Sequence, residues 1–128
     1  MLKYFFLLLL CSTTAQADWL KLGENSIETA YVDNIETHGP HKIRMWGLFD
    51  LKTPAAFGDL TYSSMKIQRE YHCLDKTSRV ISMQAHAGQM GTGEMVYSNN
   101  THNKPAPVQP DSAEEALWNV ACKKTMDN

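Results

Sequence analysis

The sequence predicts an α+β fold, an antiparallel β-sheet of about six strands with one C-terminal helix packed on one face. Over residues 64–73, even positions are polar and odd positions are apolar apart from Arg69. This is the period-2 pattern of a strand with one buried face. Near the C-terminus, apolar residues instead recur at helical spacing. Cys73 lies in the alternating segment and Cys122 in the helical one, so a bridge between them would hold the helix against the sheet.

Residues 1–17 have the features of a secretory signal peptide. Lys3 supplies a positive charge, residues 4–10 form an apolar run, and residues 15–17 have the sequence Ala-Gln-Ala, typical of a cleavage site. We therefore expect export and cleavage, which leave residues 18–128 as one domain. The apolar run is too short for a transmembrane helix, and no later segment is long enough.

The cysteines indicate one disulfide. Cys11 leaves with the signal peptide, and Cys73 and Cys122 remain. Two cysteines in an exported domain are typical of a disulfide bond. A bond between them would close a loop of about fifty residues, which stabilises a small domain by roughly 4 kcal/mol in the chain-entropy model. Oxidation of both cysteines also leaves no thiolate for nucleophilic catalysis.

The first half of the expected domain contains three predicted strands. Residues 18–24 and 26–33 are short segments bounded by Gly, Asn or Asp, which favours strands. A Gly-Pro turn within residues 34–41 follows. Residues 42–50 have apolar side chains at both odd and even positions, as expected of a strand in the interior of a sheet. The composition of residues 51–60 predicts a long loop.

The alternating strand is followed by two more strands. After a polar break at residues 74–77, apolar residues return at odd positions between 81 and 85, and again at 95 and 97. The glycines of residues 88–93 predict a hairpin turn rather than a phosphate-binding loop, because the next element is a strand. Residues 99–110 contain three prolines, which predicts an irregular connection.

The C-terminal segment, residues 110–124, predicts the helix. Its N-terminal end offers two capping pairs, Asp111 with Glu114 or Ser112 with Glu115. The apolar stripe comprises Ala113, Leu117, Val120 and Ala121, with Trp118 and Cys122 at its border.

Composition and motifs argue against several classes of function. A formal net charge of −2 without a long basic run disfavours nucleic acid as a partner. No serine lies in a G-x-S-x-G elbow, and Glu114 and Glu115 suit a helix N-terminus better than an acid/base pair. We therefore expect neither catalysis nor a cofactor.

The histidines provide a weak candidate for a metal site. His38 and His41 flank the Gly-Pro turn, and they could hold a soft metal if a third ligand such as His102 or Glu36 came near. A solvated turn is the favoured interpretation, because no carboxylate or cysteine has standard ligand spacing.

Aromatic residues offer the best material for a binding surface. If Trp46 lies on the polar side of the sheet with Leu48 and Val80, the three form an exposed apolar patch, which marks an interface and suits a homodimer. The aromatic residues considered are Trp19, Trp46, Phe49, Phe57 and Tyr62.

Two arginines complicate the alternation. The parity of Arg69 and Arg79 predicts that both lie on the apolar side, where their stems would cover the edge of the core, with Arg79 over Tyr71. Contact with a ligand is the alternative. Together with residues on the polar side of the sheet, Arg79 completes the candidate binding surface, which comprises Trp46, Leu48, His72 and Arg79.

Several short segments, taken in order, carry a family resemblance: Trp19, residues 31–33, 45–50, 62–71 and 88–93, Cys73 with Arg79, and Leu117 and Trp118 with Cys122. This ordered set resembles the surface-adhesin protein E family of Gram-negative bacteria. The resemblance implies a small exported domain with an antiparallel sheet, a C-terminal helix and a disulfide joining them, and a surface role in binding host matrix proteins. It also implies partner contacts in the last loop, residues 101–108.

The leading functional hypothesis is therefore a non-enzymatic exported binding protein that contacts a host matrix or envelope protein. One alternative is a periplasmic carrier of a small ligand, a metal or haem through His38, His41 and His102. Another is an accessory envelope protein with structural contacts only. The expected location is the periplasm or the outer cell surface.

Overall fold

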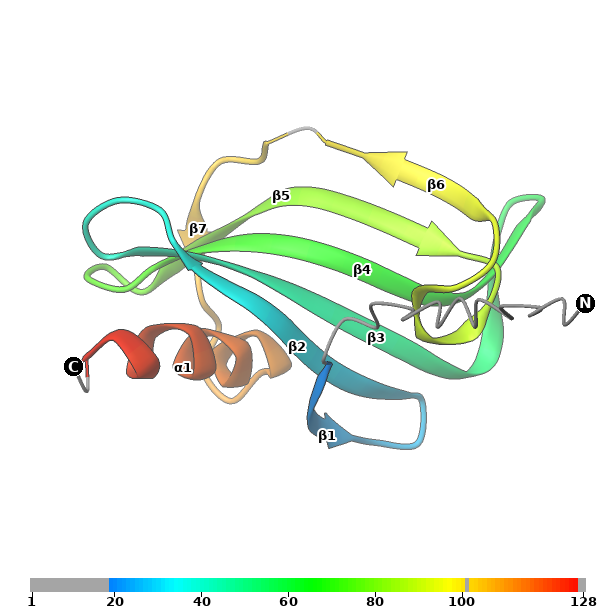
Figure 1. Cartoon of the computed structure of the whole chain (residues 1–128), viewed down its shortest axis with the longest axis horizontal. Helices are drawn as coiled ribbons and strands as arrows, with labels where there is room; N and C mark the ends of the chain where they lie inside the picture. Colours follow the sequence, from blue (N-terminus) through cyan, green and yellow to red (C-terminus); the bar gives the residue numbers. More distant parts are fainter. Residues whose placement is uncertain (1–18, 101, 127–128) are drawn as a thin grey trace, which may run out of the picture.

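The computed structural model describes residues 19–100 and 102–126, so the predicted signal peptide lies outside the described residues. The described chain forms a seven-stranded antiparallel sheet and one α-helix (Figure 1). Six strands follow one another across the sheet in chain order, and the seventh pairs with β5. The predicted class is confirmed, with one strand more than expected. The elements are β1 (Leu20–Glu24), β2 (Glu28–Thr37), β3 (Lys42–Phe57), β4 (Leu60–His72), β5 (Thr77–His86), a 3-10 turn η1 (Gln89–Gly91), β6 (Met95–Asn99), β7 (Ala106–Pro107) and α1 (Ala113–Met126).

Strand β3 is longer than the sequence predicted. It continues to Phe57 and turns through two residues into β4, so the predicted loop over residues 51–60 is wrong. The pairing of β2 with β3 ends at Leu51, and the register of β3 with β4 is irregular after Asp50. Pro54 falls in this irregular stretch, where a residue without an N–H is tolerated. The two strands therefore form a long hairpin that projects beyond β2.

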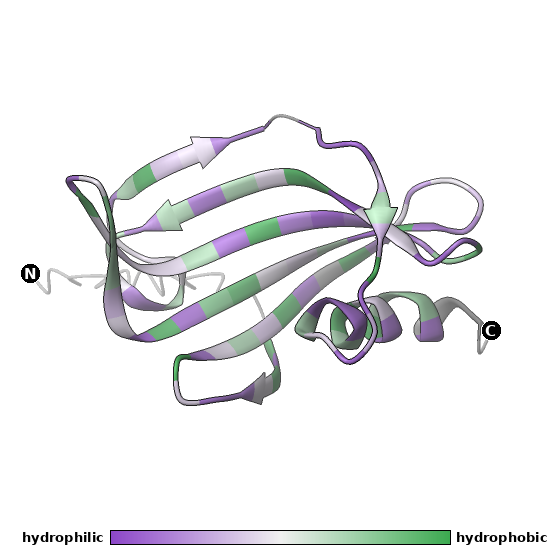
Figure 2. Cartoon of the chain, turned by 180° about the vertical axis from the view of Figure 1, so that it is seen from behind, coloured by the Kyte–Doolittle hydropathy of each residue, from purple (hydrophilic) through white to green (hydrophobic). Residues whose placement is uncertain are grey.

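The central strands show the predicted alternation, and polar and apolar bands follow one another along them in Figure 2. Tyr71, an odd-numbered residue of β4, is buried in the core with Leu117 and Cys122 of α1. Its neighbour Glu70 lies opposite Arg44 of β3, on the other side of the sheet. We call this second side, away from α1, the open face.

A β-bulge between β4 and β5 changes the predicted faces. Gln68 pairs with Ser82 and Arg69 pairs with Val80, so Ile81 is an extra residue in β5. Such an insertion reverses the relation between residue parity and sheet face. As a result, the predicted positions of two β5 residues are wrong, because Val80 shares the helix side with Arg69 and Arg79 lies opposite Glu70 on the open face.

Helix α1 covers one end of the apolar face, as expected. The predicted disulfide joins Cys73 to Cys122, with a Cα–Cα distance of 5.6 Å. Next to it, the indole Nε1 of Trp118 donates to the backbone oxygen of His72 at 3.2 Å. The buried core comprises Val32, Ile43, Met45, Tyr71, Leu117, Ala121 and Cys122.

The start of α1 uses the second of the two predicted capping pairs. The Glu115 N–H donates to Oγ of Ser112 at 3.1 Å, which satisfies one of the free N–H groups of the first turn. Two further contacts hold the N-terminal end of α1 against the sheet. Ser78 Oγ donates to Glu114 Oε1 at 2.5 Å. Lys76 Nζ lies 2.7 Å from Glu115 Oε2.

The glycine-rich segment forms the predicted connection between β5 and β6, and it also packs over β3 and β4. The Met90 N–H donates to Asp50 Oδ1 at 2.8 Å, and the Gly91 N–H donates to Ser64 Oγ at 2.9 Å. Gly88 is required by close approach, because a Cβ there would lie 2.8 Å from the backbone oxygen of Thr92. This segment covers one end of the open face and leaves the other end uncovered.

Candidate functional site

A buried carboxylate organises the uncovered end of the open face. Glu70 is only 1% exposed and accepts hydrogen bonds from three side chains on three strands. Arg44 Nε donates to Oε2 at 3.0 Å, Arg79 Nε donates to Oε1 at 3.1 Å, and His72 Nε2 contacts Oε1 at 2.8 Å. We call these four residues the Glu70 cluster.

The strand register produces this cluster. Arg44 of β3, Glu70 of β4 and Arg79 of β5 lie directly opposite one another in three neighbouring strands. Glu36 of β2 extends the same row beside Arg44, so the signs of charge alternate across four strands. Opposite charges in directly opposed positions stabilise a sheet, while the arginine stems shield the carboxylate from water.

The electrostatics of the cluster keep Glu70 ionised. Burial by itself raises the pKa of this carboxyl, but hydrogen bonds from His72, Arg44 and Arg79 more than offset burial and lower the pKa to about 2. Because an ionised carboxylate only accepts hydrogen bonds, His72 must donate from Nε2. Glu70 is thus a fixed negative charge rather than a proton donor.

The structure places the predicted surface residues on the open face, but not all at its surface. Trp46 lies opposite Gln68 in the row next to the Glu70 cluster and is half-buried. His72 and Arg79 belong to the cluster itself. Leu48 lies on the same face and is fully buried. Since Val80 is on the helix side, the exposed apolar patch expected of these residues does not form.

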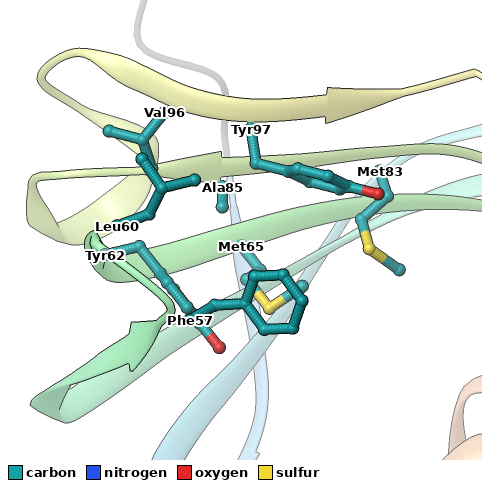
Figure 3. Close-up of a pocket in the computed structure, with 8 residues that line it drawn as sticks. All are labelled: Phe57, Leu60, Tyr62, Met65, Met83, Ala85, Val96 and Tyr97. Carbon is teal, nitrogen blue, oxygen red and sulfur yellow. The ribbon is translucent and has the colours of Figure 1, made fainter.

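An apolar groove occupies the end of the helix side that α1 leaves uncovered (Figure 3). Its volume is about 200 Å³. The β3–β4 hairpin and strand β6 form opposite sides of the groove, and Phe57 is 73% exposed. The lining residues are Phe57, Leu60, Tyr62, Met65, Met83, Ala85, Val96 and Tyr97.

The lining of this groove is almost entirely apolar. Its side chains are aliphatic, aromatic or thioether groups, and the two tyrosine hydroxyls are their polar atoms. Among the described residues, no carboxylate, histidine or lysine lines it. Phe57 and Tyr62, two of the aromatic residues considered for binding, do lie together here.

The candidate metal ligands lie in exposed connections. His38 and His41 belong to the β2–β3 turn, and His102 belongs to the connection between β6 and β7. Within residues 19–100 and 102–126, no group of three or more His, Cys, Asp or Glu side chains is arranged to hold a metal ion. Among the described residues, no helix is both long enough and apolar enough to cross a membrane.

Comparison with known proteins identifies the family. The family model for surface-adhesin protein E matches residues 19–123, which include every strand and most of α1. The chain belongs to the surface-adhesin protein E family. This membership confirms the resemblance predicted from the ordered segments. No curated protein matches the sequence.

Solved structures show that the surface-adhesin protein E fold is retained at low sequence identity. The crystal structure of protein E from non-typeable Haemophilus influenzae is similar with a TM-score of 0.67 and 12% identity, covering 90% of this chain and 82% of that chain. Two further Haemophilus influenzae protein E structures have TM-scores of 0.68 and 12% identity. They cover 88% and 91% of this chain and 92% of each of theirs. At this identity, the likeness concerns the fold.

Two members of the Glu70 cluster were not among the predicted site residues of this surface-adhesin protein E chain. Arg44 and Glu70 both occupy even positions of predicted strands, which is the available signal that they face the same side. Alternation alone does not say which residues of two strands lie opposite each other. Only the register of β3 with β4 brings the two together.

Proposed function

We propose that this protein is exported and acts as a non-enzymatic binding protein on the outer cell surface, where it contacts host matrix proteins. Membership of the surface-adhesin protein E family supports the binding role. The signal-peptide features of residues 1–17 support export. The absence of an acid/base pair from the groove and the complete pairing of Glu70 support a role without catalysis.

The observation that carries the proposal is the uncovered end of the open face. There, half-buried Trp46 lies in the row next to the row of Arg44 and Arg79, whose side chains are 20% and 26% exposed. Tryptophan and arginine are enriched among the residues that dominate protein–protein binding energy. The contacting surface in this proposal comprises Trp46, His72 and Arg79, with Arg44 in addition. Leu48 supports this surface from within and makes no contact of its own.

Protease treatment of intact cells tests the location. We expect added protease to cut the protein while a periplasmic control survives. The same cells should adhere to immobilised collagen or fibronectin, and adhesion should fall in a strain that lacks the protein. Survival of the protein until the outer membrane is broken, or unchanged adhesion of the deletion strain, would contradict the proposal.

The apolar groove favours a second candidate function, carriage of a small apolar molecule. A volume of about 200 Å³ is below the roughly 300 Å³ at which ordinary ligand pockets begin, so a molecule of one or two fused rings fits better than haem. A titration with 1-naphthol, followed by the fluorescence of the ligand, tests this candidate. Saturable binding that is lost in Tyr97→Ser supports it, and the absence of saturable binding contradicts it.

A further inference from the structure

The two arginines of the Glu70 cluster are held in place without using their terminal nitrogens. Arg44 and Arg79 each donate from Nε to a different oxygen of the same carboxylate. No other hydrogen bond or ion pair joins either guanidinium to another described residue. Because both side chains are about a fifth to a quarter exposed, the terminal N–H groups are available at the surface.

This arrangement fixes two planar donors at low entropic cost. A guanidinium offers five N–H groups in a rigid fork that matches a carboxylate or a phosphate. An arginine that is free in solution loses rotamer freedom when it binds, whereas one already anchored through Nε has lost most of it. Glu70 therefore orients both forks before any partner arrives.

The net charge of the Glu70 cluster suits a single carboxylate as ligand better than a polyanion. Glu70 neutralises one of the two guanidiniums, so the cluster retains one positive charge when His72 is neutral. On the same face, the exposed side chains of Glu36 and Lys42 are of opposite sign, and Asp33 already has an interaction of its own. A nucleic acid or a phospholipid surface would require a broader basic patch than this one.

We propose that the terminal nitrogens of Arg44 and Arg79 form a binding site for a carboxylate of an acidic segment on a protein partner. This inference rests on the proposed binding function and specifies the chemistry of its partner. Trp46 lies in the adjacent row and supplies apolar surface for the residues next to the bound Asp or Glu. Bidentate Arg–carboxylate contacts give such a site geometric specificity as well as attraction.

The experiment uses residues 18–128 with the disulfide formed, and a fluorescein-labelled tetraglutamate peptide as the probe. Fluorescence anisotropy should show saturable binding that weakens with added salt, because the contact is between charges. The double variant R44K/R79K keeps the charge and a donor for Glu70 but removes both forks. We expect its affinity for the peptide to fall about tenfold or more.

Matched controls distinguish recognition by the two guanidinium groups from general attraction between opposite charges. R69K changes an arginine of β4 that lies on the helix side and pairs with Glu114, so it should bind the peptide as the wild type does. A tetraglutamine peptide should not bind. If R44K/R79K does not fold, the single variants R44K and R79K each leave one fork, and each should show an intermediate loss.

Several results would overturn the inference. These are no binding of tetraglutamate by the wild type, equal binding of tetraglutamine, or unchanged affinity in the lysine variants. Displacement of the peptide by inorganic phosphate, or tighter binding to phosphatidylglycerol vesicles than to the peptide, would instead assign the site to phosphate groups. Adhesion of cells to matrix proteins that persists in R44K/R79K would overturn this inference and leave the proposed function standing. Peptide binding that depends on the two arginines, in the absence of any cell adhesion, would support this inference and contradict the proposed function.

Discussion

Glu70 shows how a charged residue is accommodated inside a small sheet. A buried carboxylate without partners loses the hydration that stabilises its charge. Here two guanidiniums and an imidazole replace that hydration at distances between 2.8 and 3.1 Å. Both arginines donate to this one carboxylate, so removing it leaves them without the counterion that they share.

The first prediction at this scale concerns stability. Glu70→Gln should lower the free energy of unfolding by about 2 kcal/mol, because a neutral amide cannot balance two partly buried guanidiniums. Urea unfolding near neutral pH measures the change. Glu36→Gln is the matched control, since Glu36 lies in the same row but is exposed. Equal stability of the two variants would contradict the assigned role of Glu70.

A second prediction concerns pH. The folded-state pKa of Glu70 is about 2, below the ordinary value of 4.5. A carboxyl whose pKa is lowered by folding contributes stability above the unfolded pKa, and that contribution is lost as pH falls through the folded pKa. The stability difference between wild type and Glu70→Gln should therefore be largest above pH 4.5 and shrink towards pH 2.

Thermal unfolding of both proteins across this range measures that difference. The comparison removes the contributions of Glu24 and Glu115, whose pKa values are also lowered by hydrogen bonds from lysines. A difference that stays constant down to pH 2 would mean that another group is responsible.

At the scale of single elements, α1 depends on its first turn. The sequence allowed two capping pairs, and the structure uses Ser112, whose Oγ accepts from the Glu115 N–H. We expect Ser112→Ala to cost about 1 kcal/mol of unfolding free energy, because an N–H group loses its partner. Urea unfolding tests this, with Ser26→Ala at an exposed position of the β1–β2 connection as the control. Equal effects of the two substitutions would exclude a capping role.

Strand β3 shows why the composition of an element can mislead. The Thr-Pro-Ala-Ala sequence of residues 53–56 is typical of a loop, yet these residues belong to the strand. Pairing with β4 resumes at Ala55 and continues to Phe57. The extension carries Phe57 to the edge of the apolar groove.

For the whole molecule, the disulfide joins the sheet to the helix across a sequence separation of 49. Its removal frees the C-terminal segment in the unfolded chain, which in the chain-entropy model costs about 4 kcal/mol. We predict that the Cys73→Ser/Cys122→Ser variant loses stability by about this amount. Urea unfolding with and without reductant measures the loss. Reductant should destabilise the wild type and leave the double variant unchanged, and any other pattern would contradict the prediction.

The sequence by itself determined the α+β class, the faces of β4, the capped C-terminal helix and the pairing of Cys73 with Cys122. These features depend on local periodicity or on having two cysteines to pair. Only the tertiary structure decided that Arg79 meets Glu70, because an extra residue in β5 reverses the faces that parity predicts. It also decided that Leu48 is buried. The physical reason is that strand register and the packing of distant segments depend on residues far apart in the chain, which alternation within one strand does not encode.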